Sequence, residues 1–236
     1  MRADYIDHMG DDLRVVNAAR VSFNKESFLE TFTSGSGDRQ KVWQELQNSD
    51  KKLLGYLSRH GHWTPFSHPQ ITLRETVPIF VARQRFKYMI GFAYNEVSRR
   101  YVDDTPEFFV PDVWRARPDT SIKQGSGDEV IGFLDMEDQH SHVNEMYDDH
   151  IEKVMGLYKR LIAGNVAPEQ ARMVLPQSMY TSYYVTGSLA AWARAYKLRI
   201  DPHAQKEIQD LAAEWGGIIQ PLYPVSWEAL TTGEAK

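Results

Sequence analysis

The sequence contains no cysteine among its 236 residues. This absence excludes disulfide bonds, zinc sites built from thiolates and catalysis by a cysteine nucleophile. No apolar run approaches the length needed to cross a membrane. The first residues, MRADYIDHMGDDLRVV, are acidic and polar, which is not typical of a signal peptide. Together these absences predict a cytoplasmic protein with no membrane partner.

The two standard glycine-rich phosphate loops, GxGxxG after a strand and GxxxxGK followed by Ser or Thr, are also missing. The formal net charge is −5, so the whole surface does not favour nucleic acid, and we expect no nucleic-acid partner. Any phosphate that the protein binds should therefore be held by a local arginine cluster.

The length and ordinary composition predict one domain over residues 1–236, of mixed α/β (α+β) type, with a variable loop and helix segment at about 103–150. Alternation of apolar and polar residues predicts a half-buried strand at 70–77. Richness in Tyr and Thr predicts a second strand at 177–188. Helical periodicity predicts helices at 12–23, 41–60, 79–93, 129–164 and 189–200. Pro168 is predicted to occupy a first helical turn. A last helix is predicted with Asp201 as its N-cap and Pro202 as its first residue. Residues 25–41 and 103–130 are predicted to be loops.

Polar residues are concentrated between aromatics in one short run, RQRFKYMIGFAYNEVSRRYV, at 83–102. The sequence Ser98-Arg99-Arg100 suits a phosphate group, because arginine forks match its oxygens and the serine hydroxyl adds a donor. A solvated patch or ion pairs to Asp103, Asp104 and Glu107 explain the run about equally well.

Arg172 and Arg199 each stand alone in an apolar setting, so each can bind a ligand or pair with a carboxylate. We expect no metal. His62 and His68 in GHWTPFSHP lack a third ligand nearby, and the acidic, histidine-rich stretch at 135–150 is too irregular for a cation loop.

Six segments in this order resemble the flavin-dependent thymidylate synthases. They are VVNAARVSF (15–23), GHWTPFSHP (61–69), PIFVARQ (78–84), NEVSRRY (95–101), EQARMVLP (169–176) and LRIDPHAQKEI (198–208). The resemblance implies methylation of dUMP to dTMP, with 5,10-methylenetetrahydrofolate as carbon donor, NADPH as reductant and FAD as electron carrier. It also implies a mixed antiparallel sheet with flanking helices, and a homotetramer whose active sites each use more than one subunit. The absence of cysteine agrees with this resemblance, because the flavin-dependent reaction needs no enzyme nucleophile.

The resemblance also assigns roles by matching position. The residues implied to bind dUMP are Gln84, Lys87, Glu96, Ser98, Arg99, Arg100, Arg172 and Arg199. The residues implied to bind FAD are Ser22, His62, Thr64, Tyr88, Met89, Ile90, Asn95, Glu96, Ser188 and Arg194. Arg199, Ser98 and Glu96 are the implied catalytic residues, and His203 is expected to shape the site.

The chain departs from the family in one place. Lys87-Tyr88-Met89 stands where the family signature begins with Arg-His-Arg, and the spacing to NEVS is one residue longer. A lysine supplies charge without a bidentate fork, and tyrosine does not carry out histidine's proton chemistry near neutral pH. Two alternatives follow, a nucleotide-binding homologue that has lost methyl transfer and a flavin enzyme that only oxidises NADPH.

Overall fold

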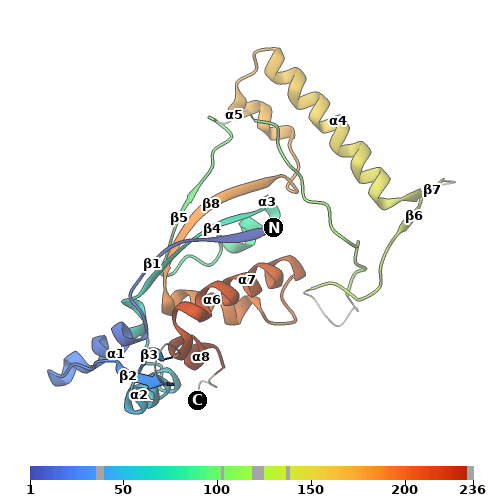
Figure 1. Ribbon diagram of the computed structural model, residues 1–236. Coiled ribbons are helices and arrows are strands. Elements are labelled where there is room, and N and C mark those ends of the chain that lie inside the picture. Colours follow the sequence, from blue (N-terminus) through green and yellow to red (C-terminus); the bar gives the residue numbers. More distant parts are fainter. Residues whose placement is uncertain (36–39, 102–103, 119–124, 137–138, 233–236) are drawn as a thin grey trace.

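An antiparallel sheet forms the centre of the protein (Figure 1). The computed structural model describes residues 1–35, 40–101, 104–118, 125–136 and 139–232. The strand order is β1-β4-β8-β5, and every neighbouring pair is antiparallel. The strands are β1 (Arg2–Met9), β4 (Gln70–Pro78), β8 (Tyr180–Ser188) and β5 (Phe92–Glu96). The expected α+β class with a mixed antiparallel sheet and flanking helices is confirmed.

The two central strands were predicted correctly, β4 from its alternation of apolar and polar residues and β8 from its richness in Tyr and Thr. In β4, Ile71, Leu73 and Val77 point inward and are fully buried. The opposite face is polar, and Thr72 meets Thr186 of β8 across it with their hydroxyls 2.9 Å apart. The sheet therefore has one face packed on the core and one polar face.

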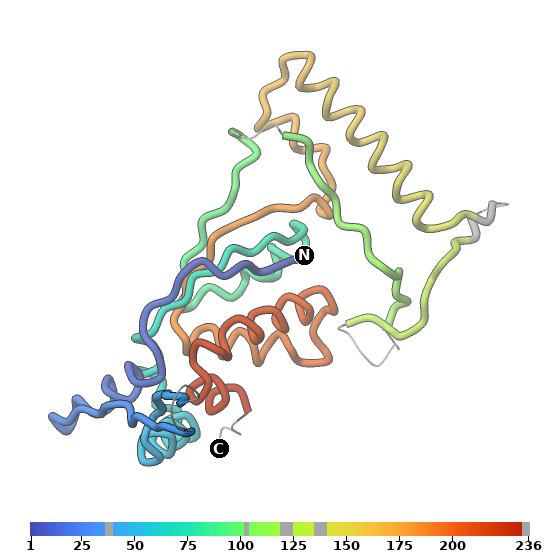
Figure 2. The backbone as a smooth tube through the Cα atoms, in the orientation of Figure 1, coloured from blue at the N-terminus to red at the C-terminus, as the bar shows by residue number. Residues whose placement is uncertain are grey.

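Helices cover the buried face of the sheet, as Figures 1 and 2 show. They are α6 (Leu189–Arg199), α7 (Lys206–Leu222) and α8 (Pro224–Thr232). Trp192 of α6 and Trp215 of α7 are fully buried, with ring centroids 5.4 Å apart. This tryptophan pair lies at the heart of the hydrophobic core. α1 (Asp12–Arg20) and η1 (Val21–Phe23) occupy the predicted helix at 12–23, after an edge strand, β1, that the sequence pattern did not reveal.

The prediction for residues 25–60 was wrong in its first half. A hairpin of β2 (Glu30–Ser34) and β3 (Lys41–Glu45) replaces the expected loop and the first turn of the expected helix. Phe32 pairs with Trp43 across the hairpin, and their rings stack at 5.8 Å. Such cross-strand aromatic pairs favour strand over helix. The helix α2 therefore begins later than predicted and covers Asn48–Arg59. The short helix η3 (Pro65–Ser67) follows it.

The helix predicted at 79–93 ends early. α3 covers Ile79–Arg85, a turn follows, and β5 starts at Phe92. Gly91 has a φ of +83°, a conformation that ends the turn and that other residues rarely adopt. The aromatic segment then joins the sheet beside β8 because its residues fit a pleated surface. Gln84, Lys87 and Tyr88 consequently do not share one helical face, as the predicted periodicity required.

The chain leaves the sheet after β5 and rejoins it at β8. Residues 104–118, the strap, cross beside the helices as an extended chain, in agreement with the expected loop. The predicted helix at 129–164 begins later, since β6 (Phe133–Met136) and β7 (Gln139–His142) precede α4 (Val143–Ala163). α4 lies away from the sheet (Figure 2). It leads to α5 (Pro168–Ala171) and η4 (Arg172–Val174), and Pro168 holds the predicted first helical position.

The last boundary correction concerns Asp201 and Pro202. They form a turn, and α7 begins at Lys206 with Gln205 as its N-cap. The Asp201 carboxylate instead accepts a hydrogen bond of 2.8 Å from the His203 backbone N–H, a local turn that competes with helix capping. Among the residues described, no helix combines the length and apolarity of a membrane span.

Candidate functional site

Gln84 and Arg199, 115 positions apart in sequence, meet where α3 and α6 end. The Arg199 guanidinium donates a hydrogen bond of 3.3 Å from Nη2 to the Gln84 carbonyl oxygen. Both residues line a cavity of about 650 Å³, the Arg199 cavity, together with Lys197, Asp201 and His203. Two of the predicted dUMP residues thus line one cavity, and His203 lines it with them.

The chemistry of the Arg199 cavity suits a polar planar ring. Burial lowers the pKa of Arg199, and the nearby Arg85 cation lowers it further, yet a guanidinium stays charged in proteins. The side-chain oxygen of Gln84 is buried and lacks a hydrogen-bond partner among the described residues. A fixed cation and a free amide acceptor are the groups that a pyrimidine ring, with carbonyl acceptors and a ring N–H donor, can satisfy.

Four of the predicted FAD residues gather around a second cavity of about 420 Å³, the Arg194 cavity. Ile90, Ser188 and Arg194 line it, and the Arg194 guanidinium carbon lies 5.1 Å from the centroid of the Tyr88 ring. Ser188 is also the N-cap of α6, since its hydroxyl accepts from the Ala191 N–H at 3.2 Å. These residues come from β8, α6 and the turn at 86–91, the flavin-side loop.

Lys197 and Trp63 are among the cavity residues that the sequence analysis did not assign. Lys197 lines both cavities, so the two are adjacent along α6. Trp63 lines the Arg194 cavity, and it separates His62 from Thr64 in the turn before η3. Nothing in the local pattern distinguished Lys197 from a surface lysine, whereas Trp63 lies inside a segment already singled out.

The Arg194 cavity fits the chemistry of a flavin dinucleotide. Arg194 and Lys197 supply the positive charge that a diphosphate needs, and Ser188 supplies a hydroxyl. Trp63 and the small side chains of Ala190 and Ala191 provide an apolar wall for a planar ring system. In contrast, Met89, Ser22 and Asn95 are exposed and are not among the residues that line the Arg194 cavity.

The arginine cluster after β5 lies elsewhere. Arg99 forms an ion pair with Asp104, one of the three carboxylates proposed as partners for this run. Asp103, another of the three, lies outside the described residues. Arg100 donates from Nε to the Ser98 hydroxyl at 3.3 Å. The end of β5 and the end of α6 lie on different sides of the molecule (Figure 1), so the Ser98–Arg100 cluster does not reach the Arg199 cavity within one subunit.

The other predicted dUMP residues are not among those that line the Arg199 cavity either. Arg172 is exposed in η4, and its Nε donates to the Glu169 carbonyl oxygen at 3.3 Å. Glu96 accepts a hydrogen bond of 2.7 Å from the Thr181 hydroxyl, and Lys87 is exposed on the flavin-side loop. In the described part of the chain, neither Arg172 nor Arg199 forms an ion pair, so the carboxylate-pairing alternative finds no partner there.

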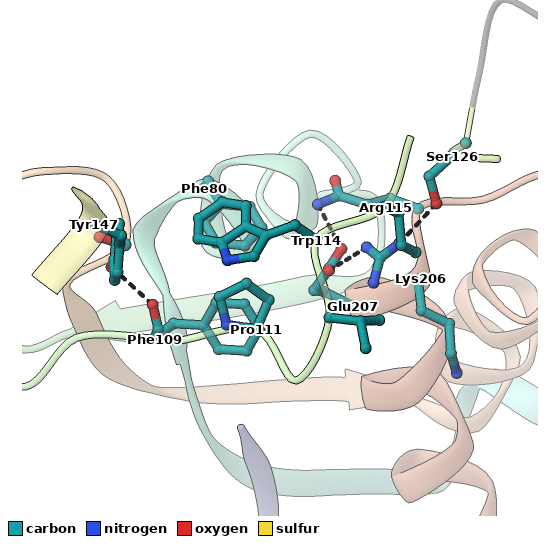
Figure 3. Close-up of a pocket in the computed structure, with 13 residues that line it drawn as sticks. Phe80, Phe109, Pro111, Trp114, Arg115, Ser126, Tyr147, Lys206 and Glu207 are labelled. Atoms are coloured by element: carbon teal, nitrogen blue, oxygen red, sulfur yellow. Dashed lines mark hydrogen bonds and ion pairs between the residues drawn. The ribbon is translucent and has the colours of Figure 1, made fainter. Parts of the chain in front are cut away.

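A third cavity, of about 550 Å³, lies between the strap and the start of α7 (Figure 3). Phe80, Phe109 and Trp114 contribute aromatic walls, and Tyr147 donates to the Phe109 carbonyl oxygen at 2.8 Å. Gly125 and Gln205 line this cavity as well as the Arg199 cavity. The aromatic cavity and the Arg199 cavity are therefore neighbours that meet at Gly125 and Gln205.

An ion pair holds the strap in place. Arg115 of the strap pairs with Glu207 in the first turn of α7, and Gln205 donates to the same carboxylate at 2.9 Å (Figure 3). Burial by itself would raise the pKa of Glu207, but the hydrogen bond from Arg115 and those from its neighbours bring it below its usual value. Glu207 is therefore an anion at neutral pH.

Metal ions require sets of ligand side chains, which the described residues do not supply. Over the residues described, no group of three or more histidine, aspartate or glutamate side chains is placed to hold a metal ion. Glu137 and Asp138 of the acidic stretch at 135–150 lie outside the described residues.

Comparison with known proteins gives the class of the protein. The sequence profile of the family described as thymidylate synthase complementing protein matches residues 4–225. The chain is 38% identical over 224 residues to the flavin-dependent thymidylate synthase of Kosmotoga olearia, a match that covers 95% of this chain and 87% of that protein. It is 32% identical to an enzyme of the same name from Thermus thermophilus, with 95% of this chain and 73% of that protein covered.

Solved structures support the same class. A UMP/dUMP methylase, PolB from Streptomyces cacaoi, bound with 5-Br dUMP superposes with a TM-score of 0.75 at 27% identity, over 98% of this chain and 94% of that chain. The same methylase bound with 5-Br UMP gives a TM-score of 0.76 at 28% identity, over 98% and 93% of the two chains. The chain belongs to the family of flavin-dependent thymidylate synthases, as the six sequence segments predicted, and it is an enzyme.

Proposed function

We propose that this protein methylates dUMP to dTMP, with 5,10-methylenetetrahydrofolate as carbon donor and NADPH as reductant, through bound FAD. The observation that carries the proposal is the adjacency of the Arg199 and Arg194 cavities, which share Lys197 in a chain without cysteine. The flavin, when bound, passes hydride equivalents from NADPH to the nucleotide, so no enzyme thiolate is required.

The proposed role of Arg199 is electrostatic. Its guanidinium, half-buried and fixed to the Gln84 carbonyl, lies where a pyrimidine carbonyl would develop negative charge during reduction. A preorganised cation in such a site stabilises that charge more than water does. The buried amide oxygen of Gln84 would accept the ring N–H and set the orientation of the base. His203, held by Asp201 at 2.9 Å, shapes the cavity wall beside them.

We propose that the nucleotide phosphate is bound by the Ser98–Arg100 cluster and Arg172 of a neighbouring subunit, with Glu96 beside the sugar. The reason is geometric, since these residues lie apart from the Arg199 cavity within one subunit. Two surfaces support self-association. The polar face of the sheet carries Tyr184, which is 49% exposed, and α4 lies away from the core. We accordingly propose a homotetramer, a single domain over 1–236 and a cytoplasmic location.

The altered triplet does not remove the flavin-side loop. Tyr88 lies against Arg194, so an aromatic–guanidinium contact orders the loop in this chain. Met89 and Lys87 are exposed and would reach a ligand held partly by another subunit. For this reason we favour the active enzyme over a homologue without methyl transfer or an NADPH oxidase.

The test begins with the visible spectrum of the purified protein after FAD addition and desalting, with and without dUMP. A retained flavin band that shifts with dUMP would support one shared site. An assay for dTMP with methylenetetrahydrofolate and NADPH follows, with UMP run in parallel. Retained flavin with NADPH oxidation but no dTMP would favour the oxidase, and dUMP binding without flavin would favour the nucleotide-binding homologue.

A further inference from the structure

A charged pair is buried in the core directly behind the flavin-side loop. Arg85, the last residue of α3, is 1% exposed, and Glu75 of β4 is fully buried. The Arg85 guanidinium lies 3.4 Å from the Glu75 carboxylate, which also accepts a hydrogen bond of 2.5 Å from the Tyr183 hydroxyl. Buried ion pairs add little net stability compared with apolar residues of similar volume, so the effect of this pair lies in what it orders.

Four aromatic rings enclose the Arg85 guanidinium. Its central carbon lies 4.4 Å from the centroid of Phe92, 4.7 Å from that of Trp215, and 5.1 Å from those of both Tyr94 and Trp192. Ring faces attract a cation, and a desolvated cation most strongly. The cage therefore fixes the side chain in one orientation, with one edge on Glu75 and another directed toward Tyr94.

Tyr94 carries this fixed orientation to the loop. Its hydroxyl accepts a hydrogen bond from Nη1 of Arg85 and donates one of 3.0 Å to the Tyr88 carbonyl oxygen. Burial raises the pKa of Tyr94 to about 12, so the hydroxyl remains a donor at neutral pH. The backbone of the flavin-side loop is thus tied at Tyr88 to a charged group in the core.

We propose that Arg85 is a positioning residue for the flavin. Through the Tyr94 hydroxyl it holds the Tyr88 carbonyl, and so it sets how the loop presents Lys87, Met89 and Ile90. Neither Arg85 nor Tyr94 needs to touch a ligand for this effect. The inference rests on the proposed function, because the loop's ligand is taken to be FAD.

Two tyrosines of the same buried cluster provide a matched test. Tyr94→Phe removes the hydroxyl that reaches the loop, whereas Tyr183→Phe removes a hydroxyl that reaches only Glu75 among the contacts described. We expect Tyr94→Phe to raise the Kd for FAD, measured by flavin fluorescence, about tenfold, which corresponds to one lost hydrogen bond of roughly 1.4 kcal/mol. We expect Tyr183→Phe to leave that Kd within about twofold, although both variants lower Tm.

A second readout does not need the flavin. Hydrogen exchange of the backbone amides at 88–92 in the FAD-free protein should be faster in Tyr94→Phe than in Tyr183→Phe, because the loop is released in the first variant alone. Arg85→Met should match Tyr94→Phe in both readouts if it folds. Arg85→Lys, which keeps the charge but loses the fork, should fall between Arg85→Met and wild type.

Equal effects of the two tyrosine variants on FAD affinity and on loop exchange would overturn the proposal and leave Arg85 a structural residue. Wild-type protein that binds no FAD would count against the proposed function. In that case the exchange comparison would still establish or refute the control of the loop by Arg85.

Discussion

Arg194 of α6 donates a hydrogen bond of 2.8 Å from Nη2 to the carbonyl oxygen of Ile90. The same guanidinium lies against the Tyr88 ring, so one side chain holds the flavin-side loop at two points. Arg194, which the family resemblance assigns to flavin binding, is thus also an anchor of the loop that carries three other residues assigned to flavin.

Arg194→Ala should therefore weaken FAD binding by more than about tenfold, because it removes a charge from the cavity and releases the loop. Titration of FAD into the protein by fluorescence measures the effect. Arg2→Ala, which removes an exposed arginine from the edge strand β1, is the matched control and should leave the Kd unchanged. Equal affinities for wild type and Arg194→Ala would remove Arg194 from the flavin site.

Arg199→Ala should reduce dTMP formation by at least about a hundredfold, the usual cost of losing one preorganised charge-stabilising group. The fold should persist, since Arg199 is half-buried at a helix end. Turnover and a circular dichroism melt on the same sample check both parts. Unchanged turnover in this variant would show that Arg199 does not stabilise the reacting ring.

A composite site predicts complementation between two inactive variants. Ser98→Ala should weaken dUMP binding, and Arg100→Ala should reduce turnover. Mixing subunits of Arg100→Ala with those of Arg199→Ala should restore part of the activity, because some sites then receive both intact halves from different chains. The activity of co-expressed, co-purified mixtures gives the answer. Mixtures that stay as inactive as each parent would place both halves in one subunit.

Gly91→Ala should destabilise the protein by about 1–3 kcal/mol, since its φ is +83° and the added Cβ would lie 2.8 Å from the Cβ of Ala191. Gly156→Ala is the contrasting control. Gly156 lies inside α4, and an added Cβ there meets nothing within 4 Å. That variant should gain up to about 1 kcal/mol from helix propensity. Urea unfolding of both proteins measures the difference, and equal stabilities would contradict the strain at Gly91.

Glu207→Gln should lower the free energy of unfolding at pH 7 by about 1.5–3 kcal/mol, the range for a hydrogen bond to a charged group. The folded-state pKa of Glu207 lies below the unfolded value of about 4.5. Its charge therefore stabilises the fold above pH 4.5, and this contribution is lost as the pH falls through the folded pKa. Denaturant unfolding of both proteins at pH 7 and near pH 4 should give a smaller difference at the lower pH. A difference that stayed constant with pH would mean that the ion pair with Arg115 is not its source.

Some of the strands and helices could be predicted from the local sequence alone. The strand at 70–77 alternates so regularly that its burial follows from sequence, and the strand at 177–188 is rich in Tyr and Thr. The helix after Leu189 was also predicted correctly. The hairpin at 30–45 and the strand β5 were not, because each is stabilised by a partner strand that local periodicity does not include.

The candidate site divides in the same way. Six short segments were sufficient to indicate the family, and the missing cysteine excluded the thiol route. The two sets of ligand-binding positions follow from the family resemblance and stay predictions. Tertiary structure alone determined that Gln84 meets Arg199, that Lys197 joins two cavities, and that the Ser98–Arg100 cluster lies apart from them. The physical reason is that motif chemistry is a property of short segments. The meeting of those segments depends on strand pairing and core packing between residues more than a hundred positions apart.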